Sequence, residues 1–205
     1  MAPNIPAAAP DVVIRRAELE DVEAVLESVS EMAKASATAA HWSRTALYPY
    51  VATEAAGGAL HAKAMFLACV TSPAGGAAAA GGEKPVSARI PPIDWIVGFA
   101  AFSTIMTVGA GESTLENMVV AMPWQRQGIG RRLLAAGLLW CRAHASGTVF
   151  LEVRKSNRAA IALYDQAQFT VVGNRPGYYR EPVEDGLQMQ KFLGTVVRPV
   201  EFLSC

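Results

Sequence analysis

The feature that most constrains this chain is a glycine-containing turn between an apolar strand and an amphipathic helix. Residues 115–120 (LENMVV) are apolar and β-branched enough to predict a mostly buried strand. Residues 131–144 carry Leu134 and Leu138 at helical spacing, with arginines off that stripe. Between them lies QRQGIG, residues 125–130, where two glycines allow a close approach of the backbone. The first amides of a helix have no partner within it and carry its positive dipole end, so this turn predicts an anion site, with phosphate as the expected anion.

Two familiar phosphate-binding loops do not fit this turn. A P-loop requires a lysine directly after its last glycine, and Gly130 is followed by Arg131. A dinucleotide-binding fingerprint needs a third glycine where Leu133 stands. The remaining pattern, Gln/Arg-x-x-Gly-x-Gly, resembles the acyl-CoA pyrophosphate loop of the GNAT acetyltransferases. A glycine-softened turn without a ligand is the alternative interpretation of the same residues.

A second block, residues 150–180, narrows the resemblance. It reads FLEVRKSNRAAIALYDQAQFTVVGNRPGYYR, and it begins as a strand that leads into a helix which Ser156 or Asn157 can cap. The block is similar to one GNAT branch, the RimI-type alanine N-acetyltransferases that modify the N-terminus of a small-subunit ribosomal protein. The resemblance is dense from about Ser113 to Leu193. Upstream it thins to Trp42 and the serine after it, which are similar to a Trp-Ser pair in that branch's substrate-side loop.

The resemblance implies the α/β (α+β mixed) GNAT fold. That fold has a central mixed sheet of six to seven strands flanked by about four helices, in the order β-α-α-β-β-β-α-β-α-β-β. The hydrophobic pattern of the chain is compatible with this order. It predicts strands at 12–16, 64–71, 95–106, 115–122, 149–155, 170–172 and 186–192, and helices at 19–34, 43–55, 131–144 and from residue 157 onward.

Length favours one domain, because 205 residues suffice for a single substantial core. We expect residues 11–194 to form the GNAT domain, with residues 1–10 and 195–205 as tails. The stretch 73–92 is rich in Ala, Gly and Pro, and the strand pattern resumes after it. It is therefore expected to be a flexible insertion within the domain and not a boundary between two domains.

Composition argues against several other classes of protein. Eighteen basic and eighteen acidic residues cancel, so no strong net field favours nucleic acid or a membrane surface. Three scattered cysteines suit neither a disulfide framework nor a zinc site, and Cys69 and Cys141 lie in apolar runs typical of a core. The first ten residues lack the basic start and apolar stretch of a signal peptide, and no run reaches the ~20 apolar residues of a spanning helix. We therefore expect a cytoplasmic protein with no metal and no nucleic-acid or membrane partner.

Glu152 is the candidate proton acceptor. Alternation along its strand places Glu152 and Arg154 on the face opposite the valine and leucine side chains. A carboxylate in an otherwise apolar strand is partly desolvated, which is one way that proteins make a general base. A structural ion pair with Arg154 is the alternative. The resemblance favours the base, because the proton acceptor of that branch is the glutamate of the motif LEVR.

Tyr164 is the proton donor that the resemblance implies, through the tyrosine of NRAAIALY. A phenol with a pKa near ~10 keeps its proton at neutral pH and can give it to a thiolate whose conjugate acid has a pKa near ~8.5. A core tyrosine on an Ala/Leu-rich helix face is the alternative. Asn157 corresponds to a coenzyme contact of the family, and capping of the helix explains it equally well.

The resemblance also implies the remaining coenzyme and acceptor contacts. The backbone of the strand ending in VV would meet the acetyl-pantetheine arm of acetyl-CoA, and the turn would meet its pyrophosphate. Tyr178 and Tyr179 match a double tyrosine in the loop that lines the acceptor site, with exposed turn aromatics as the alternative. Trp42 would lie on the same side. The implied coenzyme contacts are Met118, Val119, Val120, Arg126, Gln127, Gly128, Ile129, Gly130, Arg131 and Asn157.

The activity implied is an acetyl-CoA-dependent N-acetyltransferase that works by direct transfer, with the N-terminal α-amine of a protein, such as a ribosomal protein, as acceptor. A small-molecule amine as acceptor is one alternative. A non-catalytic acyl-CoA-binding module is another, disfavoured because both proton-transfer residues are present. Two departures from the family pattern affect local geometry and remove no catalytic atom. Ala121-Met122-Pro123 stands where Val-Asp-Pro is usual, and Gln168 stands where the family has glycine.

Overall fold

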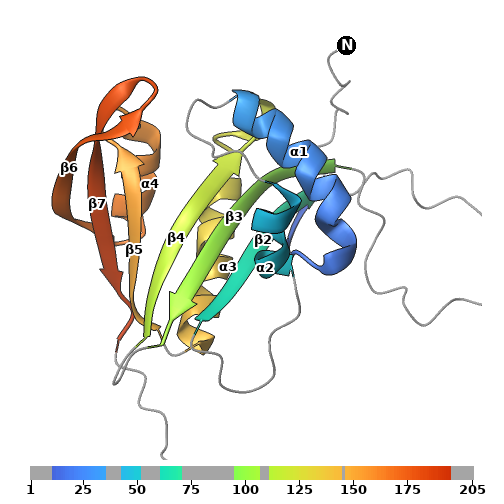
Figure 1. The fold of residues 1–205 in the computed structure, drawn as a ribbon, viewed down its shortest axis with the longest axis horizontal. Helices are drawn as coiled ribbons and strands as arrows, with labels where there is room; N and C mark the ends of the chain where they lie inside the picture. The colour runs from blue at the N-terminus through green and yellow to red at the C-terminus, as the bar shows by residue number, and fades with distance from the viewer. Residues whose placement is uncertain are drawn as a thin grey trace, which may run out of the picture.

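The described residues form one seven-stranded sheet with helices on both faces (Figure 1). The computed structural model describes residues 11–35, 43–51, 61–70, 95–106, 111–144 and 146–194. Trp42, Cys205, the predicted insertion at 73–92 and the predicted tails at 1–10 and 195–205 lie outside these ranges.

The element order confirms the predicted GNAT order, with two short 3-10 helices added at Leu19–Asp21 and Met122–Trp124. The added turns lie where the sequence predicts the start of one helix and the end of one strand. The elements are β1 (Val12–Arg16), α1 (Val22–Ala35), α2 (Arg44–Val51), β2 (His61–Val70), β3 (Trp95–Ile105), β4 (Gly111–Val120), α3 (Ile129–Ala143), β5 (Ser146–Arg154), α4 (Arg158–Gln166), β6 (Thr170–Arg180) and β7 (Val183–Phe192).

Strand β6 is the element that the sequence predicts least well. The predicted strand covers only residues 170–172, because two glycines and a proline interrupt the apolar pattern beyond it. In the structure β6 continues to Arg180 and pairs with β7 through two register shifts, at Val171/Gly173 and at Arg175/Tyr179. These irregularities accommodate the residues that break the pattern, since a bulge lets one strand carry unpaired residues.

The sheet opens between its two central strands. Its order is β1-β2-β3-β4-β5-β7-β6, and β4 and β5 are its parallel pair. Their pairing ends at Leu115 and Leu151, although β4 runs on to Val120 and β5 to Arg154. Figure 1 shows the resulting V-shaped separation. The last residues of β4 are therefore not paired with β5, and their backbone groups face the opening.

Two cores cover the two faces of the sheet. On one face, α3 and α4 pack against alternate strand residues, with Leu134 and Cys141 buried as the helical spacing predicts. On the other face, α1 and α2 cover a second cluster that contains Cys69 (Figure 1). Both cysteines are buried and unpaired, which confirms their predicted place in the core.

One close contact shows how tightly α3 lies on the sheet. A Cβ atom added at Gly137 would stand 1.9 Å from Cε2 of Phe102, a fully buried side chain of β3. A glycine is required there because the helix backbone lies directly over the ring. Among the described residues, no helix is long and apolar enough to cross a membrane, and no group of three His, Cys, Asp or Glu side chains could hold a metal ion.

Candidate active site

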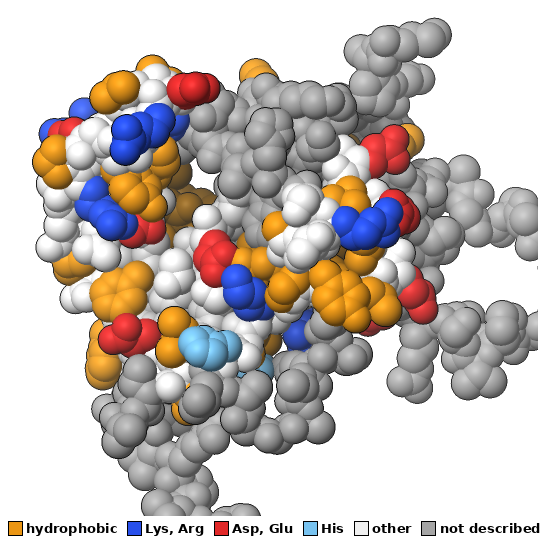
Figure 2. Space-filling view, in the orientation of Figure 1, with side chains coloured by type: hydrophobic (Ala, Val, Ile, Leu, Met, Phe, Trp, Pro, Cys, Tyr) orange, Lys and Arg blue, Asp and Glu red, His pale blue; other side chains and the backbone are white. Residues whose placement is uncertain are grey.

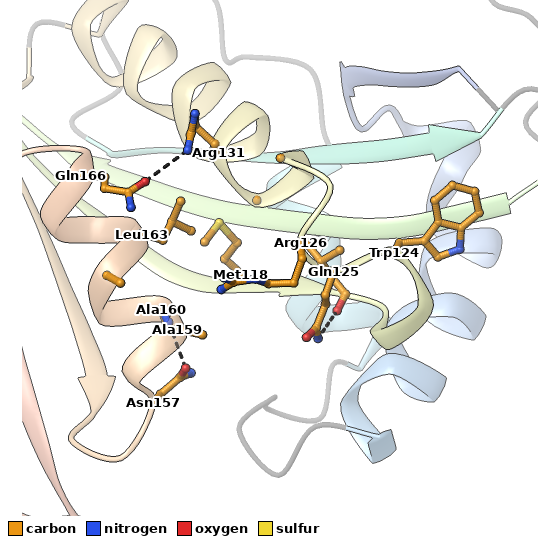
Figure 3. Close-up of a pocket in the computed structure, with 14 residues that line it drawn as sticks. Met118, Trp124, Gln125, Arg126, Arg131, Asn157, Ala159, Ala160, Leu163 and Gln166 are labelled. Carbon is orange, nitrogen blue, oxygen red and sulfur yellow. Dashed lines mark hydrogen bonds between the residues drawn. The ribbon is translucent and has the colours of Figure 1, made fainter. Parts of the chain in front are cut away.

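A cleft of about 390 Å³ lies between the end of β4, the glycine turn and the helices α3 and α4 (Figure 3). Figure 3 shows Arg131 of α3 and Gln166 of α4 meeting across it, with Nη2 donating to Oε1 over 3.2 Å. The cleft thus has a glycine turn on one side and a capped helix start on the other. It is lined by Met118, Val120, Trp124, Gln125, Arg126, Gly128, Gly130, Arg131, Asn157, Ala159, Ala160, Ala162, Leu163 and Gln166.

Three of the predicted coenzyme contacts do not line this cleft. Val119 and Ile129 are buried in the two cores. Gln127 folds back onto the turn, where its Nε2 donates to the carbonyl of Pro123 over 3.1 Å. The other seven predicted residues line it, namely Met118, Val120, Arg126, Gly128, Gly130, Arg131 and Asn157.

The glycine turn leaves the start of α3 open. Gly128 is the N-cap residue with φ 80°, a left-handed conformation that favours glycine, and a Cβ there would meet nothing within 4 Å. Gly128 has no side chain with which to cap the helix, and the first turn of α3 carries no acidic residue. Gln125 holds the turn in place, because its Nε2 donates to the carbonyl of Val120 over 2.9 Å. The first amides of α3 therefore present the positive end of its dipole to the cleft, where an anion fits.

Asn157 caps α4 as the sequence predicts. Its Oδ1 accepts a hydrogen bond from the backbone N–H of Ala160 over 3.1 Å. The same residue lines both the coenzyme cleft and a second cavity, described next. Capping and a ligand contact are therefore compatible, since the cap uses only the side-chain oxygen.

The second cavity, of about 310 Å³, brings Glu152 and Tyr164 together with Tyr178 and Tyr179, whereas Trp42 lies outside the described residues. Figure 2 shows a hollow on this face of the molecule, beside the part formed by β5, β7 and β6. The cavity shares Met118, Asn157 and Ala160 with the coenzyme cleft, so the two spaces meet at the opening between β4 and β5. We call it the acceptor cavity; it is lined by Leu115, Glu116, Asn117, Met118, Glu152, Val153, Arg154, Asn157, Ala160, Tyr164, Tyr178 and Tyr179.

Glu152 lies on the predicted face of β5, opposite the buried valine and leucine side chains. Its Oε1 accepts a hydrogen bond from Nη1 of Arg175 on β6 over 2.7 Å, and a quarter of its side chain is exposed. Periodicity within β5 could not predict this partner. The arginine on its own strand, Arg154, donates to the carboxylate of Glu184 over 3.2 Å.

Tyr164 belongs to the core and to the cavity at once. It is only 7% exposed, and its ring lies 5.9 Å from that of Phe169. Burial, followed by the charge of Tyr179, raises the pKa of its phenol above the ordinary value. The group therefore keeps its proton at neutral pH. Both sequence interpretations, core tyrosine and proton donor, are compatible with this position.

The double tyrosine is held in place by two arginines. The rings of Tyr178 and Tyr179 meet edge to face at 5.0 Å. Cζ of Arg175 lies 4.5 Å from the ring centre of Tyr178, and Cζ of Arg154 lies 4.2 Å from that of Tyr179. Burial raises the pKa of Tyr179 to about 12. The two rings are thus fixed walls of the acceptor cavity, even though Tyr178 is 42% exposed.

The sequence did not single out Glu116, a carboxylate of β4 that lines the same cavity. Tyr50 of α2 donates a hydrogen bond to Oε2 of Glu116 on β4, and Lys63 Nζ of β2 lies 3.4 Å from Oε1 of the same carboxylate. Burial and this hydrogen bond raise the pKa of Tyr50 above its ordinary value. The signal used for Glu152, a carboxylate within an apolar strand, applies to Glu116 as well.

Comparisons with known proteins identify the family of this chain. The Acetyltransferase (GNAT) family model matches residues 78–169. The [ribosomal protein bS18]-alanine N-acetyltransferase of Haemophilus ducreyi is 35% identical over 105 residues, which cover 51% of this chain and 68% of that protein. For the Mycobacterium tuberculosis N-alpha-acetyltransferase RimI the identity is 38%, over 48% of this chain and 61% of that protein. The Escherichia coli [ribosomal protein bS18]-alanine N-acetyltransferase is 44% identical, over 42% of this chain and 57% of its own length.

Solved structures share the fold. The ribosomal-protein-S18-alanine N-acetyltransferase from Escherichia coli superposes with a TM-score of 0.59 at 24% identity, covering 94% of this chain and all of that one. Arabidopsis thaliana NAA60 in complex with acetyl-CoA gives a TM-score of 0.64 at 14% identity, covering 89% of this chain and 100% of its own. The predicted fold class is confirmed. With a relative 35% identical over two thirds of its length, the chain belongs to the GNAT acetyltransferase family.

Proposed function

We propose that this protein transfers the acetyl group of acetyl-CoA to the N-terminal α-amine of a protein. The observation that carries the proposal is that the coenzyme cleft and the acceptor cavity adjoin. The coenzyme cleft has an uncapped helix start suited to a pyrophosphate, and the acceptor cavity holds Glu152 and Tyr164. Because the two share the wall formed by Met118, Asn157 and Ala160, a thioester in the cleft and an amine in the cavity would meet there.

The coenzyme would lie along the opening of the sheet. Its pyrophosphate would accept hydrogen bonds from the first amides of α3, in the turn that begins at Gly128. Its pantetheine arm would pair with the free backbone edge of β4 near Met118, which β5 leaves unpaired. The solved structure of NAA60 with acetyl-CoA supports such binding in this fold.

Glu152 would deprotonate the acceptor, and Tyr164 would protonate the leaving sulfur. Glu152, directly or through a water, takes a proton from the acceptor ammonium, and the neutral amine then attacks the thioester carbonyl carbon. As the new C–N bond forms, the C–S bond breaks and the sulfur becomes a thiolate, while the nitrogen releases its second proton to solvent, from which Tyr164 later regains the proton that it gives to the sulfur. Tyr164, which burial keeps protonated, donates a hydrogen bond and then a proton to that sulfur. Because the raised pKa of Tyr164 makes full transfer uphill, its hydrogen bond to the developing thiolate is the larger contribution.

An α-amine suits this machinery better than a lysine side chain. Its pKa is ~7.7–8 against ~10.4 for lysine, so far more of it is neutral at pH 7 and one carboxylate suffices. The walls formed by Tyr178 and Tyr179 are fixed by their arginine contacts, which favours small first residues such as Ala or Ser. The named activity of the relatives on ribosomal protein bS18 supports a ribosomal protein as substrate, and such a substrate would place the enzyme in the cytoplasm.

The test compares acceptor classes by the release of free CoA. One panel holds short peptides with free Ala, Ser or Leu N-termini, and the other holds polyamines and aminoglycosides. We expect turnover on the peptides, fastest with Ala or Ser. Turnover on the small amines alone would show that the acceptor is a small-molecule amine and not a peptide. Binding of acetyl-CoA without turnover on either panel would point to a non-catalytic acyl-CoA-binding protein.

A further inference from the structure

Two carboxylates stand beside the opening between β4 and β5. The parallel pairing ends with Leu115 opposite Leu151, and both side chains belong to the core under α3 and α4. One further step along each strand gives Glu116 and Glu152. Alternation turns Glu152 to the opposite face, and the contact of Glu116 with Tyr50 of α2 places Glu116 on that face too, because α2 covers it. Both glutamates line the acceptor cavity.

A β-bulge exposes Glu116 to the cavity. The register between β3 and β4 passes from Leu115 to Asn117, so Glu116 is the extra residue on its strand. A bulged residue leaves the regular ladder, and bulges are often found next to active sites, where they redirect a side chain. About a third of the Glu116 side chain is exposed. The carboxylate is therefore accessible from the cavity.

Glu116 is anchored by two elements outside its own strand. Tyr50 donates to Oε2, and Lys63 Nζ lies 3.4 Å from Oε1 and 3.0 Å from the Tyr50 oxygen. Lys63 Nζ also lies 4.6 Å from the centre of the Tyr50 ring. These contacts fix the direction of a side chain that would otherwise be free to rotate.

Capacity for a further hydrogen bond remains on both carboxylates. A carboxylate can accept about four hydrogen bonds. Within the described ranges, Glu116 accepts from Tyr50 and Lys63, and Glu152 accepts from Arg175. Glu116 and Glu152 carry two negative charges, and Lys63 and Arg175 carry two positive charges. These four groups together therefore have no net positive charge that would repel an ammonium. An ammonium offers three N–H donors, which suits two acceptors on either side of it.

We propose that Glu116 binds the α-ammonium of the acceptor, on the side of the acceptor cavity opposite Glu152. This inference rests on the proposed function and adds a substrate-binding residue to it. Tyr50 and Lys63 are positioning residues, since they touch Glu116 and do not themselves line the acceptor cavity. Glu152 removes the proton, whereas Glu116 holds the nitrogen near the thioester. The division of labour predicts that Glu116 acts on acceptor affinity and that Glu152 acts on turnover.

The test uses a peptide with a free N-terminal Ala and blocked lysines, together with its deaminated analogue, in which hydrogen replaces the amine. We expect Glu116→Gln to raise the KM for the peptide by about tenfold, the loss typical of one charge-assisted hydrogen bond. The value of kcat should change less than about threefold, far below the factor typical of a lost proton-transfer group. Calorimetry should give an unchanged Kd for acetyl-CoA. The matched control is Glu112→Gln, the same chemical change at an exposed position of β4 outside both cavities.

Direct binding measurements add a readout that a structural role would not move. The wild-type protein should bind the amino peptide about tenfold more tightly than the deaminated one, and Glu116→Gln should lose that preference. Tyr50→Phe keeps Glu116 but removes its anchor, so it should show a smaller loss of the same preference. If Glu116→Gln fails to fold, Tyr50→Phe still tests the inference.

Each failure has a different meaning. An unchanged KM and an unchanged preference for the amine would reduce Glu116 to a structural ion pair. A loss confined to kcat would make it a proton-transfer group, which also overturns the inference. If the wild-type protein acetylates no peptide at all, the proposed function fails first, and the inference fails with it.

Discussion

Replacing Gly128 by valine tests the coenzyme site most directly, because the structure separates its two effects. The first is a cost to folding. Gly128 has φ 80°, and forcing a side chain into this left-handed region costs roughly 1–2 kcal/mol. No atom of the described residues lies within 4 Å of a Cβ placed at this position. The variant should therefore fold, with its free energy of unfolding lowered by about that amount.

The second effect is on binding. The space beside Gly128 opens into the cleft and is where a pyrophosphate would approach the first amides of α3. A β-branched side chain there would displace the phosphate from at least one amide. A hydrogen bond to a charged group contributes about 1.5–3 kcal/mol, so the Kd for acetyl-CoA should rise by about 10- to 100-fold.

Isothermal titration calorimetry measures this Kd, and chemical denaturation measures stability. Gly194→Val is the matched control, because Gly194 also has a positive φ, at 95°, and no described residue within 4 Å of its Cβ, but lies outside both cavities. It should lose comparable stability and keep the wild-type Kd. A folded Gly128→Val protein with unchanged affinity would show that the coenzyme binds elsewhere.

Three further predictions concern the catalytic pair and two backbone positions. Glu152→Gln and Tyr164→Phe should each lower kcat by ~10²–10⁴-fold, measured by CoA release, with little change in coenzyme affinity, measured by calorimetry. The loss of kcat in Glu152→Gln should shrink at high pH, where the amine deprotonates unaided. Near-full activity of both variants would contradict the assignment. Gly137→Ala should lower the free energy of unfolding by about 1–3 kcal/mol, because its Cβ overlaps Phe102, and an unchanged denaturation midpoint would refute this. Gln168→Gly should raise stability by up to about 1 kcal/mol, since Gln168 has φ 66°, and a lower midpoint would contradict this.

Much of the fold could be predicted from the sequence, because most of its elements have strong local patterns. The alternation in β5 fixes which face carries Glu152, and the stripe in α3 fixes which residues are buried. The extent of β6 could not be predicted, since its glycines and proline break the strand pattern and only pairing with β7 restores it. The family has glycine where this chain has Gln168, and the positive φ at this position explains the preference for glycine.

The same rule holds for the site: features set by neighbouring residues could be predicted, and contacts between distant strands could not. The turn at Gly128 and the cap at Asn157 depend on neighbouring residues and could be predicted. The partner of Glu152 could not, because Arg175 reaches it from another strand that carries two register shifts. The setting of Glu116 could not be predicted either, because Tyr50 lies 66 positions before it in the chain and because a bulge cannot be read from an apolar run.

The measurement that tests the central claim most directly maps the acetyl group on one peptide prepared in two forms. The first form has a free N-terminal Ala and blocked lysines, and the second has a blocked N-terminus and free lysines. Each is incubated with the protein and acetyl-CoA, and the product is mapped by tandem mass spectrometry. We predict acetylation of the first form at its α-amine and none of the second. Acetylation of the second form alone would contradict the account.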